Sequence, residues 1–269
     1  MKYDPVKSRL GKIVSRSVWL RKIFYTLLDI LLLRTWHVKR ALRKYALENP
    51  GAENVLDAGS GFGQYTWRMW KMNKKWKILG TDIKEEQIND CNAFISKTRA
   101  RNQVSFRLAD LTSYKEDEKY DLVLCVDVME HIEDDRVVFS NYFSSLREKG
   151  WLIISTPSDK GGSDVHDEND HSFIEEHVRD GYNSDEISEK LQSAGFRDIK
   201  TGYTYGRPGK ISWKISMKYP ILILNTSMIL AIILPFYYIL VMAFVIILNY
   251  LDVRLTHSEG TGLLVIAKK

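Results

Sequence analysis

The chain has 269 residues, of which 45% are hydrophobic, and this length allows one α/β domain with an insertion or two small domains. Residues 1–45 hold twelve Lys and Arg against two acids, and since the whole chain carries +5, the remainder carries −5. The basic charge is confined to the N-terminal segment, which excludes a general nucleic-acid-binding surface on the rest of the chain. Two cysteines without a C-x-x-C pair fit a reducing, cytoplasmic compartment.

The N-terminal pattern predicts a helix over residues 15–47 in which basic, aromatic and aliphatic side chains are interleaved. This composition is typical of a helix in a membrane interface, so we expect residues 1–48 to contact anionic lipid. The alternative is a helix that covers the sheet and buries one face. The apolar residues are too numerous for a nucleic-acid-binding arm. Asp29 interrupts the apolar run and no small-residue cleavage site follows, so we expect no signal peptide.

A glycine-rich turn follows the first predicted strand. The strand ends at Val55 and Leu56, residues 57–63 read D-A-G-S-G-F-G, and a helix is predicted from residue 64. Glycine allows positive φ and lets backbone lie against a ligand, so a strand, this turn and a helix N-terminus form a nucleotide-binding corner. The spacing differs from the dinucleotide fingerprint, which would need glycine at Gln64, and no P-loop Lys follows.

The next three predicted strands each end close to an acid. Asp82 follows Gly63 by 19 residues, near the ~20 expected for an acid that binds ribose hydroxyls. Residues 120–127 have the continuous apolar core of a strand buried on both faces, and Cys125 within them is expected to be a core residue. The later strands are predicted at 77–83, 104–111, 120–127, 151–157, 196–205 and 262–267, with helices at 84–101, 139–149 and 184–194.

Residues 55–63 resemble the first motif of class I S-adenosylmethionine-dependent methyltransferases: a hydrophobic strand, Asp/Glu-x-Gly-x-Gly-x-Gly and a helix. Residues 127–135, D-V-M-E-H-I-E-D-D, resemble the fourth-strand motif of the ubiquinone- and menaquinone-biosynthesis-like (methyltransferase type 11) branch. The resemblance implies a Rossmann-like α/β fold: a seven-stranded, mostly parallel sheet with helices on both faces. We assign residues 49–205 and 257–269 to this domain and 206–256 to an apolar helical insertion before the last strand.

The resemblance also implies S-adenosyl-L-methionine as the cofactor. In that reading Asp57 supports the glycine loop and the cofactor's ammonium, Asp82 binds the ribose, and Asp110 with Leu111 contacts the adenine. The complete set of expected cofactor-binding residues is Asp57, Ala58, Gly59, Gly61, Gly63, Asp82, Ile83, Asp110, Leu111, Asp127 and Val128.

An oxygen nucleophile must lose a proton, and histidine is the usual base near pH 7. His131 is the first candidate, with Glu130 orienting it or meeting the substrate; the alternative that both only begin the next helix stays open. His166 or His171 is the second candidate, because the polar segment 158–181 is expected to cover the pocket. That segment contains metal-ligand residue types but no firm motif, so we expect no metal.

Residues 219–251 carry no charged side chain. The last strand must return to the sheet, which argues against a single crossing of a bilayer, and two full crossings need ~20 residues each. With Pro235 as a divider, each half would be a helix of ~23 Å, short of the ~30 Å hydrocarbon core. We therefore expect a monotopic association with the cytoplasmic face of the cell membrane. A lid over the pocket is the alternative.

These features predict a methyltransferase that acts on a lipophilic small molecule at the membrane surface, by O-methylation. The alternatives are a lipid head-group N-methyltransferase, or a membrane-bound interaction protein that keeps the cofactor fold without turnover. The acids at positions 57, 82 and 110 argue against the last. The sequence sets no oligomeric state.

Overall fold

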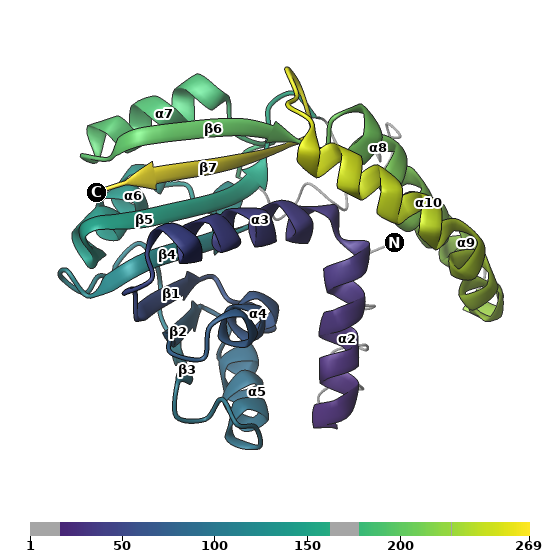
Figure 1. The fold of residues 1–269 in the computed structure, drawn as a ribbon, viewed down its shortest axis with the longest axis horizontal. Helices are drawn as coiled ribbons and strands as arrows, with labels where there is room; N and C mark the ends of the chain where they lie inside the picture. The colour runs from purple at the N-terminus through teal and green to yellow at the C-terminus, as the bar shows by residue number, and fades with distance from the viewer. Residues whose placement is uncertain (1–16, 162–177, 227) are drawn as a thin grey trace.

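The computed structural model describes residues 17–161, 178–226 and 228–269. Its described residues form a seven-stranded sheet in the order β3-β2-β1-β4-β5-β7-β6 (Figure 1). Only β7 runs antiparallel, between β5 and β6. The predicted Rossmann-like fold is confirmed. The strands are β1 (Asn54–Ala58), β2 (Lys77–Asp82), β3 (Val104–Leu108), β4 (Tyr120–Val126), β5 (Leu146–Pro157), β6 (Arg197–Thr204) and β7 (Gly262–Lys268).

Helices cover both faces of the sheet. The first face packs against α3 (Leu33–Glu48), α4 (Gln64–Met72) and α5 (Glu85–Ser96), and the second against α6 (Asp135–Ser145) and α7 (Ser184–Ser193). Neighbouring strand residues point to opposite faces, so Val55 joins the first core and Leu56 the second. This two-sided burial explains why the strands are continuously apolar, and Cys125 is a fully buried core residue as predicted.

Two predicted helices have different bounds. The single helix at 15–47 is wrong: the backbone leaves the helical region at Leu32 (φ −85°, ψ 109°), which separates α2 (Val18–Leu31) from α3. The helix expected at 139–149 ends at Ser145, because Leu146 already pairs with Tyr120 in the sheet. A register shift between β4 and β5 then accommodates the left-handed backbone of Lys149, whose φ is +65°.

The apolar insertion forms a helical hairpin that leaves the sheet after β6 and returns before β7 (Figure 1). Its first arm is α8 (Arg207–Trp213), a π-helix (Lys214–Lys218) and α9 (Tyr219–Thr226); a 3₁₀ segment (Met228–Ile233) leads into α10 (Leu234–Arg254). The expected halves of ~23 Å are wrong, because Pro235 lies in the first turn of α10, where its missing N–H breaks no helical bond. With 21 residues, or about 31 Å, α10 is long and apolar enough to cross a membrane by length and composition.

Asp252, near the end of α10, fastens the hairpin to the rest of the domain. Its fully buried carboxylate accepts the backbone N–H of Gly209 at 2.9 Å and of Tyr205 at 3.2 Å, and lies 2.7 Å from Nε2 of His37 on α3. These bonds connect α10 with α8, α3 and the end of β6. Both arms of the hairpin therefore start from one place at the sheet edge.

Candidate active site

The glycine loop lies at the carboxyl end of β1, where the strand order reverses between β1 and β4. All three glycines adopt left-handed backbone, with φ of 78° at Gly59, 50° at Gly61 and 77° at Gly63. The N–H groups of Gly59 and Ser60 donate to the carbonyl of Thr81 at 2.8 and 2.7 Å. Glycine is required here because other residues rarely adopt this backbone, and the bonds to β2 hold the loop in shape.

A ligand can lie against the loop at Gly61 but not at its neighbours. A Cβ at Gly59 would overlap Val128, and one at Gly63 would lie 3.0 Å from the Phe106 ring. A Cβ at Gly61 would meet nothing nearer than Gln87 Oε1, 3.8 Å away. The open space at Gly61 fits an elongated nucleoside cofactor lying on bare backbone at the switch point of the sheet.

Asp57 lies beneath the loop with 2% of its surface exposed, and its carboxylate accepts the hydroxyl proton of Thr66. Burial raises the pKa of this carboxyl group to about 7. The hydrogen bond from Thr66 lowers the pKa but does not offset the effect of burial. A carboxyl group with this pKa gains its negative charge when a cation such as an amino-acid ammonium approaches. Its neighbour Ala58 is fully buried.

The acid at the end of β2 shapes the loop directly. Asp82 Oδ2 accepts the N–H of Gly61 and Oδ1 accepts the N–H of Lys84, both at 2.9 Å. Each carboxylate oxygen has a further lone pair with which to meet a ribose hydroxyl. The next residue, Ile83, is exposed.

The expected adenine contacts follow β3. Asp110 is exposed and begins a turn, where Oδ1 accepts the N–H of Thr112 at 2.9 Å and its hydroxyl at 2.8 Å. The Leu111 side chain is instead buried in the core on the second face of the sheet. This pair therefore presents one exposed carboxylate and one core side chain.

Arg34 is a site residue that the sequence analysis missed. It lies in the first turn of α3 and forms an ion pair with Asp127, which follows β4 and has φ of +50°. Arg34 also hydrogen-bonds the Tyr65 phenol. Val128 follows and packs over Gly59. The only sequence signal for Arg34 was its place directly after the apolar run.

Glu130 and His131 lie in a 3₁₀ turn (Met129–His131) just beyond β4 but have opposite environments. Glu130 is 1% exposed, its Oε2 accepts the hydroxyl proton of Thr156 at 3.1 Å, and burial raises its pKa. His131 is exposed to solvent. Glu130 is thus held inside the domain against β5, whereas His131 is open to solvent. The other candidates, His166 and His171, lie outside the described residues.

The helix α2 packs on the outside of the glycine loop. Arg21 is buried, and its guanidinium donates to Asp90 Oδ2 at 2.6 Å and to the Phe62 carbonyl at 2.9 Å. Gln64, at the start of α4, donates to Asp29 at 3.0 Å. Arg21, which the composition suggested was a lipid-facing charge, instead holds α2 to the cofactor loop.

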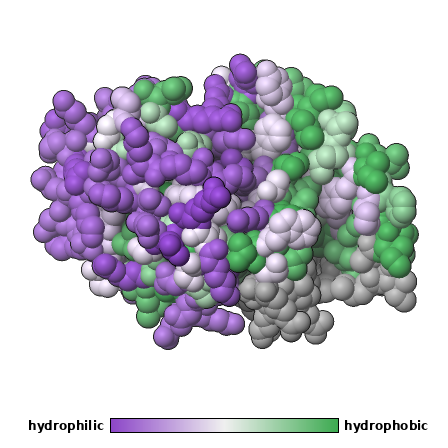
Figure 2. Space-filling view, turned by 60° about the horizontal axis from the view of Figure 1, so that its bottom comes forward, coloured by the Kyte–Doolittle hydropathy of each residue, from purple (hydrophilic) through white to green (hydrophobic). Residues whose placement is uncertain are grey.

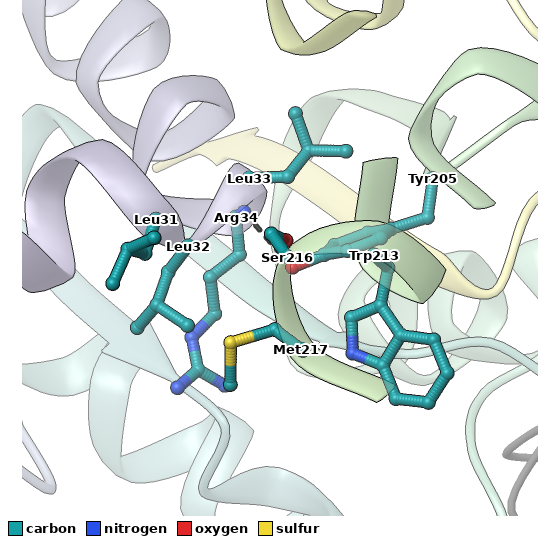
Figure 3. Close-up of a pocket in the computed structure, with 8 residues that line it drawn as sticks. All are labelled: Leu31, Leu32, Leu33, Arg34, Tyr205, Trp213, Ser216 and Met217. Atoms are coloured by element: carbon teal, nitrogen blue, oxygen red, sulfur yellow. Dashed lines mark hydrogen bonds between the residues drawn. The ribbon is translucent and has the colours of Figure 1, made fainter. Parts of the chain in front are cut away.

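A cavity of about 140 Å³ lies between the α2–α3 junction and the first arm of the hairpin (Figure 3). Figure 3 shows the Arg34 side chain running between Leu32 and Met217. The cavity is lined by Leu31, Leu32, Leu33, Arg34, Tyr205, Trp213, Ser216 and Met217. The lining combines hydrophobic side chains with the Arg34 guanidinium, the Tyr205 phenol and the Ser216 hydroxyl, and Arg34 connects the cavity with Asp127 at the end of β4.

The sheet order, the glycine loop and the acid after β2 define an α/β domain that binds a nucleoside cofactor. A family model described as a methyltransferase domain matches residues 50–195, more than half of the chain. The chain belongs to this methyltransferase-domain family, as its first motif predicted, and S-adenosyl-L-methionine is its cofactor.

Comparisons with individual proteins agree at low identity. The chain is 28% identical over 152 residues to a phosphoethanolamine N-methyltransferase of Triticum aestivum, covering 56% of this chain and 29% of that protein. It is 24% identical over 116 residues to the mitochondrial ubiquinone biosynthesis O-methyltransferase of Candida albicans, covering 43% and 36%. Its fold is similar to Haemonchus contortus phosphoethanolamine N-methyltransferase 2 in complex with S-adenosyl-L-methionine, with a TM-score of 0.57 and 18% identity over 81% of this chain and 49% of that one. The chain thus spans about a third of the curated relatives' length.

Proposed function

We propose that this protein transfers a methyl group from S-adenosylmethionine to an oxygen atom of a lipophilic small molecule at a membrane surface. The observation that carries the proposal is the arrangement of the site. The cofactor loop lies at the end of β1, and Arg34 connects the end of β4 with a cavity that has both polar and hydrophobic lining residues and is formed in part by the hairpin. An oily acceptor in that cavity would approach the cofactor from the hairpin side.

When bound, S-adenosylmethionine supplies an electrophilic methyl group on its sulfonium. The part of this chain is to bind the cofactor through the glycine loop, Asp57 and Asp82, to orient the acceptor and to exclude water. His131, exposed at the end of β4, accepts the proton that an acceptor hydroxyl loses. Glu130, held to β5 by Thr156, positions the turn that carries His131.

Methyl transfer is tested by incubating the full chain with a total lipid extract and S-adenosylmethionine labelled in its methyl group. We expect label in an organic-soluble product, with turnover lowered at least tenfold in His131→Ala while cofactor affinity, measured by calorimetry, stays unchanged. Absence of labelled product with the wild-type chain would contradict the activity. Full turnover in His131→Ala would instead move the base to another residue.

The second candidate is N-methylation of a lipid head group, which the similarity to the Triticum aestivum N-methyltransferase favours. An amine loses its proton before it attacks and needs less help from a base. Identifying the labelled product by mass spectrometry separates an ether or ester from a methylated amine.

Membrane association is supported by the hairpin and by α2. On α10, Leu240 is 81% and Ile239 76% exposed, and in Figure 2 hydrophobic surface gathers on the side where Figure 1 places α9 and α10. On α2, Trp19, Ile23 and Leu27 are exposed at a spacing of four residues, which forms one apolar stripe. So much exposed apolar surface is rare on a soluble monomer.

The charge distribution favours anionic lipid, and the connectivity favours a monotopic arrangement. The first arm contributes Lys210, Lys214 and Lys218, and no acid lies between Asp198 and Asp252. Since β7 returns to the sheet, we propose that the hairpin tip enters one leaflet, at the cytoplasmic face of the cell membrane.

Flotation with vesicles of phosphatidylglycerol and phosphatidylcholine tests this arrangement. Leu240→Asp should lower the bound fraction at least tenfold, because a carboxylate placed at membrane depth costs about 3 kcal/mol. Leu47→Asp, at a site on α3 that is 83% exposed and away from the hairpin, is the matched control and should float like the wild type. Equal flotation of all three proteins would refute the membrane role of the hairpin.

A further inference from the structure

Resting on the proposed function, we infer that the methyl acceptor is an anionic amphiphile whose carboxylate or phosphate group is held in the cavity beside Arg34, while its apolar chain lies along the hairpin. Neither the family nor the cofactor site determines the chemistry of the acceptor.

Among the described residues that line the cavity, Arg34 is the one charged residue and none is an acid. The nearest hairpin charges in the sequence are the lysines of the first arm. The acid that closes this stretch, Asp252, is fully buried and already bonded to two backbone N–H groups. An anionic group in this cavity would therefore meet the Arg34 cation, which among the described residues already interacts with the carboxyl groups of Asp127 and Glu130.

Arg34 can serve both sides at once. Its guanidinium pairs with Asp127 at the end of β4, and Figure 3 shows the same side chain among the residues that line the cavity. A guanidinium presents five N–H donors in a fixed fork, so one arginine can hold Asp127 and an anionic oxygen together. This would place the charged end of the acceptor next to the end of β4, close to where methyl transfer takes place.

Tyr205 adds a second donor to the same chamber. Its phenol oxygen accepts the backbone N–H of Arg34 at 3.0 Å and has a proton to donate in turn. Burial raises the pKa of Tyr205, so the phenol keeps that proton at neutral pH. The first turn of α3, which includes Arg34, contains no acidic residue, and its N-cap residue Leu32 has no side chain that could cap it, so the helix dipole also favours an anion there.

Part of the wall is suited to a hydrocarbon chain. Leu32, Met217 and the Trp213 ring line the cavity, and the first arm continues from them into the apolar residues of α9. The volume of about 140 Å³ far exceeds the roughly 10–15 Å³ that one water needs, and it accommodates a head group rather than a whole lipid. The remainder of the acceptor must extend along the hairpin.

Binding of four single-chain probes tests the inference without turnover. We would titrate octyl phosphate, octanoate, octanol and octyltrimethylammonium into the full chain with bound S-adenosylhomocysteine, in a neutral detergent. At least one anionic probe should bind ten times more tightly than octanol and the cation, and Arg34→Gln should remove this preference. Arg34→Lys should keep part of it. Arg101→Gln, an exposed arginine in the turn before β3, is the matched control and should bind like the wild type.

Equal binding of octanol and the anions would overturn the inference, as would anion binding that is unchanged in Arg34→Gln. Activity gives an independent outcome. If the lipid extract is separated by charge, label should enter the acidic fraction, and Arg34→Gln should raise KM for it at least tenfold with little change in kcat. Transfer to neutral lipids that is insensitive to Arg34→Gln would refute the anionic acceptor and keep the methyltransferase. Anion binding without any methyl transfer would keep the anion site and refute the methyltransferase activity.

Discussion

Replacing Asp57 by asparagine tests whether the buried carboxyl group senses the charge of the cofactor. In the cofactor-free protein its pKa is raised by burial from 3.8 to about 7. The ionised form is favoured by the ammonium of S-adenosylmethionine, so at lower pH binding must first remove the proton. If only the ionised form binds, the ionised fraction predicts an affinity roughly 15-fold greater at pH 7.0 than at pH 5.5. The α-amino group of the ligand stays charged throughout this range.

The same shift predicts the pH dependence of folding. The folded state binds more protons than the unfolded state between pH 4 and pH 7, so the stability of the cofactor-free protein falls as pH rises through this window. A shift of about three pKa units corresponds to roughly 4 kcal/mol as an upper limit. Asp57→Asn cannot ionise, so it should remove this slope and keep a hydrogen bond to Thr66.

Calorimetry at several pH values, in buffers of different ionisation enthalpy, measures both affinity and proton release. The wild type should release a proton on binding below pH 7, and Asp57→Asn should show flat, weaker binding. Asp117→Asn, an exposed acid in a turn, is the control and should retain the wild-type profile. A wild-type affinity that does not change between pH 5.5 and 7.0 would refute the assignment of Asp57 to the cofactor ammonium.

Two further substitutions test the loop and the hairpin. Gly59→Ala should lower the free energy of unfolding, measured by urea titration, by about 2–5 kcal/mol, because the new Cβ would overlap Val128 and the φ at this position is +78°. Gly51→Ala is the control: nothing lies within 4 Å of its Cβ, so its free energy of unfolding should stay within about 1 kcal/mol of the wild type. Asp252→Ala leaves two buried N–H groups without an acceptor, so amide exchange in α8 should accelerate at least tenfold relative to the sheet; equal exchange in both regions would show that other contacts hold the hairpin.

The sequence predicted the cofactor loop because its information is local. Glycines at alternate positions require left-handed backbone, and acids after consecutive parallel strands must reach the same edge of the sheet. Asp57 and Asp82 could therefore be named in advance. Arg34 and Tyr205 could not, because they meet across 171 positions in the chain and neither belongs to a motif. Their proximity results from how the hairpin packs on α3.

Two wrong expectations have physical causes. The periodicity of the N-terminal helix shows that charged and apolar residues alternate. It does not indicate which charged residues are buried, and Arg21 is buried in an ion pair with Asp90 on α5. Pro235 suggested a division because proline breaks helix interiors, but the first turn tolerates it. The length of α10 follows from that tolerance.

The hairpin is inserted between two residues that pair with each other in the sheet, so its length does not affect how the strands pair. It departs and rejoins next to Thr204 and Gly262, which are paired neighbours on adjacent antiparallel strands. A tight turn of a few residues could close the same gap, at the cost of uncovering His37. Evolution or an engineer can thus lengthen, shorten or exchange this appendage without altering the register of a single strand.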